Sequence, residues 1–243
     1  MKKAYKILIS VIVIMIIVGI IMFFVLKKTD NLPKAFDNKK NYRGSQKPNE
    51  YKYLPAEGRK FNSSELALIN DPDYKRVYDK ALEMGYRFMY EVPNANMETI
   101  NGIMVTKPTK SNFQQMANAL EIATGDRIVI RSGYRSVNRQ YNILKSNLSV
   151  PYSDSDIIDY LDGKSYPGTS THHTGRAIDI CLESDSFNSC LNSNYWINGN
   201  GKRAYKWLKE NAGDFGFELT YPENARSMKI GAYFEPWHWE YKG

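Results

Sequence analysis

Three histidines, all within two short motifs, are the residues best suited to chemistry in this chain of 243 residues. His172 and His173 lie in segment 170–179, Ser-Thr-His-His-Thr-Gly-Arg-Ala-Ile-Asp, and His238 lies in segment 235–241, Glu-Pro-Trp-His-Trp-Glu-Tyr. Structural histidines would be expected to scatter, whereas these cluster beside carboxylates, with Gly and Pro close by to bend the backbone. Two imidazoles, one aspartate and a further glutamate are the components of a catalytic zinc site, which needs three protein ligands, an open position for water and a base.

Asp179 ends the first motif, on a segment that is predicted to form a strand over residues 177–182. Thr174 and Gly175 separate this strand from the histidine pair, and a turn there would fold an imidazole back over the carboxylate. Because side chains alternate along a strand, Cys181 shares the face of Asp179 and is a physically reasonable third ligand.

The second motif offers two candidates for the base. Periodicity places Glu240 on the same face as His238, and it places Glu235 on the opposite face of a regular strand. Pro236 argues against a regular strand, because it cannot donate a ladder hydrogen bond. A bend at Pro236 would bring Glu235 beside the metal site, so that spacing leaves both Glu235 and Glu240 open as the base.

A third segment, Ser-Gly-Tyr-Arg-Ser at 132–136, follows a predicted strand at 127–131. Arg135, at the end of a strand and on a glycine-containing turn, is well placed to point into a cleft. Its guanidinium there could bind a carboxylate or a developing oxyanion. Gln140 lies near the start of the following helix, where it could face the same cleft.

Apolar periodicity and turn residues predict the elements that position these motifs. The mixture of helices, strands and long loops favours an α+β fold over a parallel βαβ arrangement. Asp71 and Pro72 mark the start of the first predicted helix, as N-cap and first helical residue. Helices are predicted over 72–84, 111–124, 137–148 and 202–212, and strands over 127–131, 177–182, 217–221 and 233–241.

The N-terminus contains a long apolar run at residues 7–26, broken only by Ser10 and Gly19. At about 1.5 Å per residue it would span roughly 30 Å, the thickness of a bilayer's hydrocarbon core. A cleaved signal peptide has a shorter apolar region of about 7–15 residues with a small-residue exit. We therefore expect an uncleaved transmembrane anchor at 7–26 after a short cytoplasmic head at 1–6, although lysines flank both ends of the run and leave its orientation undecided.

Residues 27–60 are rich in Lys, Asn and Pro and are expected to form a flexible basic linker. Residues 1–60 carry 13 Lys and Arg against 4 Asp and Glu, whereas the remainder carries 20 against 22. The basic character therefore belongs to the anchor and its linker, which either bind anionic lipids or acidic wall polymers or are merely solvated. Residues 61–243 suffice for one domain, and they show no basic patch with interleaved aromatics that would predict nucleic-acid binding.

The chain has two cysteines, Cys181 and Cys190. Outside the cell they could close a short disulfide loop. Two cysteines nine residues apart are equally compatible with two free thiols, so the sequence leaves their state open.

Taken together, the three segments resemble the zinc D-alanyl-D-alanine carboxypeptidases of the VanY type, in the superfamily that also includes lysostaphin-like peptidases and the hedgehog signalling domain. The family pattern Ser-Gly-Tyr-Arg-Ser, then Ser-x-His-x-x-Gly-x-Ala-x-Asp, then Glu-x-Trp-His-x-x-Tyr is met in order, and the resemblance covers roughly residues 75–243. It implies an α+β fold with a central antiparallel sheet flanked by helices, and one Zn²⁺ ion as cofactor.

The resemblance also implies a role for each residue of the site. His172, Asp179 and His238 correspond to the zinc ligands. Glu235 becomes the catalytic base in preference to the alternative in the same motif, and Arg135 becomes the group that stabilises the oxyanion of the scissile carbonyl.

Two further residues, Gln140 and Ser170, are implied to bind substrate. His173 falls at a variable position of the pattern and is expected to be a neighbour of the site, not a ligand. Cys181 has no counterpart among the ligands of the family.

The function implied is removal of the terminal D-Ala from peptidoglycan stem pentapeptides, which would also remove the dipeptide that glycopeptide antibiotics bind. Such a substrate exists only outside the membrane or on its outer leaflet, so the domain at 61–243 is expected on the cell-wall side of a single-pass anchor. Two alternatives stay open. The first is an L,D-carboxypeptidase that trims tetrapeptides, and the second is a non-catalytic, zinc-stabilised module that binds the wall.

Overall fold

The structure is a computed structural model that describes residues 63–86, 89, 91, 97–225 and 233–243. The predicted head, anchor and linker lie outside these residues. Within the part of the chain that is described, no helix has both the length and the apolar character needed to cross a membrane.

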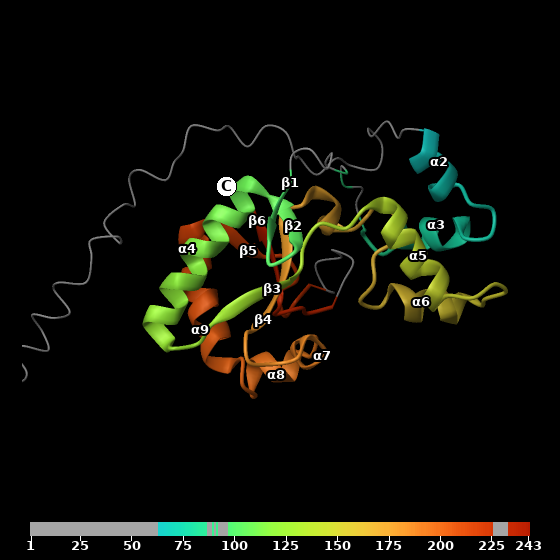
Figure 1. Cartoon of the computed structure of the whole chain (residues 1–243). Coiled ribbons are helices and arrows are strands. Elements are labelled where there is room, and N and C mark those ends of the chain that lie inside the picture. The colour runs from blue at the N-terminus through green and yellow to red at the C-terminus, as the bar shows by residue number, and fades with distance from the viewer. Residues whose placement is uncertain (1–62, 87–88, 90, 92–96, 226–232) are drawn as a thin grey trace, which may run out of the picture. The chain divides into compact units, whose positions relative to one another are not determined.

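A four-stranded antiparallel sheet forms the centre of the domain (Figure 1). Its strands lie in the order β3 (Ile128–Ser132), β4 (Ala177–Leu182), β6 (His238–Tyr241) and β5 (Phe217–Leu219). All six residues of β4 are buried, as expected of a central strand. The predictions of an α+β fold and of a central antiparallel sheet are confirmed.

One face of the sheet packs against two helices, α4 (Lys107–Thr124) and α9 (Lys202–Asn211), which contact each other. Ile178 and Ile180 of β4 belong to the same hydrophobic core as Leu120 of α4. Burying an aliphatic side chain of this size contributes about 1.5–3 kcal/mol. Because side chains alternate along β4, this packing turns Asp179 toward the opposite face.

Four further helices gather around a second hydrophobic core (Figure 1). Buried tyrosines connect them: the hydroxyl of Tyr86 donates to the Leu161 carbonyl, and that of Tyr166 donates to the Ile69 carbonyl. The helix that carries Gln140 is one of the four, and this second core holds it in place. The four helices are α2 (Ser63–Ile69), α3 (Lys75–Glu83), α5 (Val137–Asn147) and α6 (Asp154–Leu161).

A separate hairpin of β1 (Met97–Ile100) and β2 (Ile103–Thr106) was not predicted from the sequence. Asn101 and Gly102 form its turn with φ of 51° and 79°, as an Asn-Gly hairpin turn requires. The hairpin supports both turns of the site, because the Met104 carbonyl accepts from the Tyr134 N–H and the Thr106 N–H donates to the Gly175 carbonyl.

Several predicted boundaries are wrong for local reasons. The first predicted helix begins at Lys75 and not at Pro72, because Asp71 accepts the Asp73 N–H in a preceding turn. Helix α4 begins at Lys107, earlier than predicted, because the Thr106 side chain caps it.

The C-terminal strand prediction also needs correction. The predicted strand over 233–241 is real only from His238 onward, because residues 236–237 form a turn, and β5 ends at Leu219 instead of residue 221. The helices α2 and α6 were not predicted from the sequence. Four shorter elements were also missed: η5 (Thr171–Thr174), α7 (Phe187–Cys190), α8 (Ser193–Ile197) and η6 (Ala212–Phe215).

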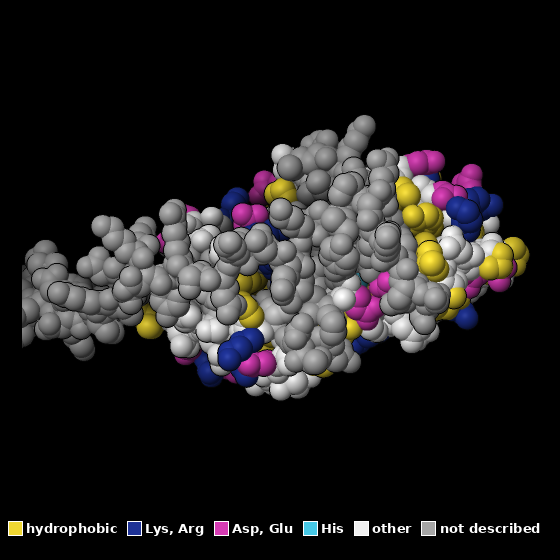
Figure 2. Space-filling model, turned by 90° about the horizontal axis from the view of Figure 1, so that it is seen from above, with side chains coloured by type: hydrophobic (Ala, Val, Ile, Leu, Met, Phe, Trp, Pro, Cys, Tyr) yellow, Lys and Arg dark blue, Asp and Glu magenta, His cyan; other side chains and the backbone are white. Residues whose placement is uncertain are grey.

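The described surface carries charges of both signs. In the view of Figure 2, Lys and Arg side chains are interspersed with Asp and Glu, and hydrophobic side chains appear in small groups between them. Exposed ion pairs such as Lys75–Asp79 and Lys80–Glu83 contribute to this mixture.

A disulfide joins Cys181 of β4 to Cys190 of α7. Both residues are fully buried in the core beside the sheet. The pairing resolves the choice that the sequence left open. It also overturns the idea that Cys181 is a metal ligand, because a disulfide sulfur has no thiolate to offer a metal.

The disulfide should contribute to stability in proportion to the loop that it closes. For a loop of this length the entropic model gives about 2–3 kcal/mol. We expect dithiothreitol to lower the free energy of unfolding by that amount in urea titrations. A variant carrying both Cys181→Ala and Cys190→Ala should unfold at one midpoint with or without the reductant, and equal midpoints for the wild-type protein would contradict a stabilising disulfide.

Candidate active site

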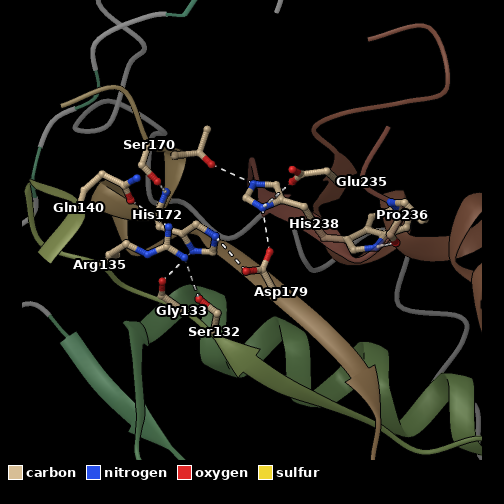
Figure 3. A network of polar contacts seen from close by, with 12 residues as sticks. Ser132, Gly133, Arg135, Gln140, Ser170, His172, Asp179, Glu235, Pro236 and His238 are labelled. Atoms are coloured by element: carbon tan, nitrogen blue, oxygen red, sulfur yellow. Dashed lines mark hydrogen bonds and ion pairs between the residues drawn. The ribbon is translucent and has the colours of Figure 1, made fainter. Parts of the chain in front are cut away.

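The register of two neighbouring strands brings the first two site residues together. Asp179 of β4 lies directly opposite His238 of β6 in the antiparallel ladder. Their side chains meet on the face away from α4, where Asp179 Oδ1 lies 2.9 Å from His238 Nδ1 (Figure 3). Both side chains are nearly inaccessible to solvent.

His172 reaches the same carboxylate from the short 3₁₀-helix η5. The Ser170 hydroxyl caps this helix by accepting the His172 N–H, and Gly175 ends it with φ of 64°. This left-handed conformation favours glycine, and a side chain at Gly175 would also require the thioether end of Met97 to move. The turn places His172 Nε2 at 3.2 Å from Asp179 Oδ2.

Hydrogen bonds on the outer ring nitrogens orient both imidazoles. The Gly133 carbonyl lies 2.7 Å from His172 Nδ1 and can only accept, so the proton sits on Nδ1 and Nε2 keeps its lone pair. The Thr171 hydroxyl lies 2.9 Å from His238 Nε2. Such outer contacts are typical of histidines that bind metal, because they fix the ring and the tautomer.

The donor set suits a metal ion. One ligand atom each from His172, Asp179 and His238 lies within 4.8 Å of the others, and all three residues are buried. Two imidazole nitrogens and one carboxylate oxygen are ligands that zinc accepts in catalytic sites with three protein ligands. The residues therefore fit one zinc ion, in line with the cofactor predicted from the sequence.

The charges of this cluster depend on one another. Burial favours a neutral carboxyl, but the two imidazoles outweigh it and hold the pKa of Asp179 below its usual range. Burial lowers the pKa of His172, whereas at His238 the hydrogen bond and charge of Asp179 outweigh burial and raise the pKa. Asp179 is thus a permanent negative charge in the interior, and a bound cation would compensate it.

Glu235 lies beside the cluster because the chain turns before β6. The His238 N–H donates to the Glu235 carbonyl across Pro236, and Glu235 Oε2 lies 3.8 Å from His238 Nδ1 (Figure 3). Burial, reinforced by the charge of Asp179, raises the pKa of Glu235 to about 7, where a carboxylate can exchange protons at neutral pH.

Glu240, the other candidate base, is used elsewhere. It lies in β6 opposite Ala177, and its carboxylate forms an ion pair with Lys242 at 2.7 Å. The geometry therefore favours Glu235 as the carboxylate of the site.

Arg135 points toward the cluster from the turn after β3 (Figure 3). Its guanidinium donates to Gln140 Oε1 at 2.9 Å and to the Ser132 hydroxyl at 3.4 Å. Burial lowers its pKa, while the charges of Asp179 and Glu235 oppose that shift. A cation thus lies close to the two carboxylates of the site.

The residues predicted to bind substrate have other partners in the structure. Gln140 is buried, and its amide accepts from Arg135 and donates to the Ser165 carbonyl at 2.5 Å. Ser170 is also buried and caps η5. These contacts make both residues supports of the site, and their contact with substrate stays a prediction.

The sequence motifs did not reveal one further residue of the site, Tyr221. Tyr221 follows β5, and its ring lies 4.9 Å from that of His238. Its hydroxyl shares a hydrogen bond with Thr171, and burial raises its pKa far above the usual range. Tyr221 reaches the site because β5 pairs with β6, a neighbourhood that no local pattern encodes.

A comparison with known families assigns most of the domain. The profile of the VanY family, described as D-alanyl-D-alanine carboxypeptidase, matches residues 102–243, which is more than half of the chain. The chain belongs to this family. The match begins later than the resemblance read from the motifs, so α2 and α3 precede the matched region.

Curated relatives agree with this assignment. The chain is 34% identical over 119 residues to the putative carboxypeptidase YodJ of Bacillus subtilis, a match of 49% of this chain and 40% of YodJ. It is 29% identical over 126 residues to a D-alanyl-D-alanine carboxypeptidase of Enterococcus faecalis, covering 50% of this chain and 42% of that protein. The chain thus spans about two fifths of the length of these curated relatives.

Solved structures show the same similarity. VanYB in complex with D-alanine-D-alanine aligns with a TM-score of 0.50 and 28% identity, over 63% of this chain and 79% of that chain. The LdcB LD-carboxypeptidase, whose structure is said to reveal the molecular basis of peptidoglycan recognition, aligns with a TM-score of 0.50 and 29% identity. The alignment covers 63% of this chain and 66% of that chain.

Zinc should stabilise the folded protein through the His172–Asp179–His238 cluster. A ligand at about 100 times its Kd adds about 2.7 kcal/mol, or roughly 5–10 °C in Tm for a domain of this size. We expect this rise when Zn²⁺ is added to the metal-free wild-type protein, and less than about 2 °C for Asp179→Asn, because the amide provides no negative charge. The exposed change Asp159→Asn should keep the full rise, and an undiminished rise in Asp179→Asn would exclude the cluster as the site.

Proposed function

We propose that the chain is a zinc-dependent carboxypeptidase that removes the terminal D-Ala from peptidoglycan stem pentapeptides. The observation that carries the proposal is the buried His172–Asp179–His238 cluster with Glu235 beside it at 3.8 Å from His238 Nδ1. Membership of the VanY family supports the reaction, and the D-alanine-D-alanine complex of VanYB supports the substrate.

Each side chain near the cluster has a chemical task in this proposal. A zinc ion held by His172, Asp179 and His238 would supply Lewis acidity toward the scissile carbonyl and would acidify a water molecule. Glu235 accepts the proton of the attacking water and returns it to the leaving amino group of D-Ala. The raised pKa of Glu235 suits both steps, because a carboxyl with a pKa of about 7 gains and loses a proton readily near neutral pH.

Arg135 stabilises the negative charge that develops on the carbonyl oxygen in the transition state. Its guanidinium is held by Gln140 and Ser132 before any substrate binds, so little reorganisation is required during the reaction. The chain-terminal carboxylate of the substrate also needs a hydrogen-bonding partner. Tyr221, whose ring lies 4.9 Å from that of His238, is a candidate beside the cluster.

Glu235→Gln should abolish most of the activity without loss of the metal. Removal of a general base typically costs about 10²–10⁴-fold in rate, and glutamine preserves the shape of the side chain. We expect D-Ala release from a stem pentapeptide to fall by that factor, while bound zinc stays equimolar. Glu240→Gln changes the other buried carboxylate of the motif, on the following strand β6, and should keep most of the activity. The reverse pattern would make Glu240 the base.

The strongest alternative is an L,D-carboxypeptidase that acts on stem tetrapeptides. The similarity to the LdcB LD-carboxypeptidase, as close as that to VanYB, supports this reading. Parallel assays with pentapeptide and tetrapeptide distinguish the two: release of D-Ala from the pentapeptide supports the first proposal, whereas exclusive turnover of the tetrapeptide supports the second. A protein that bound either peptide and released nothing would be a wall-binding module, a role for which neither Glu235 nor Arg135 would be required.

We further propose that residues 7–26 anchor the protein in the cell membrane, with residues 61–243 on the cell-wall side. The support is the length and apolarity of the run, together with a substrate that occurs outside the membrane. The full chain should sediment with membranes and should be cleaved by protease added to intact protoplasts. A variant that lacks residues 7–26 should be recovered without membranes, and membrane association of that variant would exclude the anchor.

A contribution to glycopeptide resistance is a second biological proposal. Removal of terminal D-Ala destroys the dipeptide to which these antibiotics bind, so expression of the active chain should raise the inhibitory concentration of vancomycin. Glu235→Gln is the matched inactive control for this measurement.

A further inference from the structure

His173 is a fully buried residue whose role the family pattern does not explain. It is adjacent to His172, but it is not part of the metal cluster. Its Nδ1 lies 2.6 Å from the Arg135 carbonyl, and its Nε2 lies 3.0 Å from the Gly168 backbone nitrogen. The motif pattern makes His173 only a neighbour of the site, whereas these contacts connect it to Arg135.

The two backbone partners define the protonation of the His173 ring. A backbone N–H can only donate, so Nε2 of His173 must carry a lone pair toward Gly168. A backbone carbonyl can only accept, so Nδ1 must carry the proton toward Arg135. His173 is therefore a neutral imidazole in the Nδ1–H tautomer, with a donor at one end of a rigid ring and an acceptor at the other.

The peptide groups of Arg135 are held on both sides by this histidine pair. The Arg135 N–H donates to the His172 carbonyl at 3.2 Å, and the Arg135 carbonyl accepts from His173. The backbone that carries the guanidinium is thus tied directly to η5, the element that also carries a proposed metal ligand. These two bonds fix the peptide groups of Arg135 relative to η5.

The other end of His173 connects this assembly to the preceding loop. Gly168, which binds His173 through its N–H, also accepts the Met89 N–H at 2.9 Å through its carbonyl. The same loop contains Ser165, whose carbonyl holds Gln140, the partner of the guanidinium. The main chain and the side chain of Arg135 are therefore supported by one loop through two separate hydrogen-bonded routes.

We propose that His173 is a positioning residue, which sets the main chain of Arg135 and thereby directs its guanidinium at the scissile carbonyl. This inference rests on the proposed carboxypeptidase activity. An arginine that acts mainly in the transition state affects kcat more than KM, and a displacement of about 1 Å can cost up to about 10²-fold in rate. His173 should consequently influence kcat without contact with substrate or metal.

Two conservative variants separate the two hydrogen bonds of His173. Asparagine can place an N–H near the position of Nδ1, so His173→Asn keeps the donor to Arg135 and loses the acceptor for Gly168. Glutamine can place an oxygen near the position of Nε2, so His173→Gln does the opposite. We expect kcat on the pentapeptide to fall about 10- to 100-fold in His173→Gln with KM within about threefold of wild type, and to fall less than about threefold in His173→Asn.

A double-mutant cycle tests whether the effect passes through Arg135. In an Arg135→Ala background, the further change His173→Gln should alter kcat by less than about twofold, because there is no guanidinium left to direct. Bound zinc should stay equimolar in all of these variants. Tyr74→Phe is the control for general destabilisation, because it removes a buried hydrogen bond to the Leu148 carbonyl. This variant should lower Tm without changing kcat.

Three outcomes would overturn the proposal. These are an equal loss of kcat in His173→Asn and His173→Gln, a full effect of His173→Gln in the Arg135→Ala background, and loss of zinc in His173→Gln. Nitrogen NMR of the imidazole rings gives a readout that needs no turnover. The ring signals of His173, identified by their loss in the variants, must be those of an Nδ1–H tautomer. A wild-type protein that released no D-Ala would refute the carboxypeptidase itself, whereas an active protein insensitive to His173→Gln would refute this inference alone.

Discussion

The antiparallel pairing of β4 with β6 places Asp179 opposite His238, and the whole site is arranged around the carboxylate buried by that pairing. A charged carboxylate in the interior is unfavourable unless it is compensated, and here two imidazoles face its two oxygens at 2.9 and 3.2 Å. An isolated carboxylate would be unstable at this position. Together with the two imidazoles, it forms a site that is well suited to hold a cation.

The elements around this pair mainly serve to bring the remaining groups to it. Gly133 has no room for a side chain, because a Cβ there would lie 2.4 Å from the Met104 carbonyl of the hairpin. The carbonyl of Gly133 holds His172 Nδ1. Gly175 adopts a left-handed conformation against Met97 and returns the chain into β4. The β1–β2 hairpin thus supports both turns without contributing a side chain to the metal cluster.

The proton chemistry of the site follows from unequal burial and charge. Glu235 and Asp179 are both buried carboxylates, but Asp179 lies against two imidazoles and its pKa falls, whereas burial dominates at Glu235 and its pKa rises to about 7. Neighbouring groups thereby shift the pKa values of two buried carboxyl groups in opposite directions, as the proposed roles of metal ligand and base require. This division is the physical basis on which the peptidase proposal stands.

The sequence by itself determined the chemical types of the site residues and the motifs that carry them, because these are local patterns around His172, Asp179, Glu235 and His238. It also predicted β4 with its observed limits, since a buried central strand has a strong local signature. Spacing left Glu235 and Glu240 open, and the family resemblance pointed to Glu235; the tertiary structure then placed Glu235 beside His238 and Glu240 beside Lys242. Only the tertiary structure paired Cys181 with Cys190, and only it showed the ring of Tyr221 beside His238 and His173 against the Arg135 carbonyl. Those outcomes depend on strand register, on turns such as that at Pro236, and on hydrogen bonds between distant segments, which the spacing of residues along a chain does not specify.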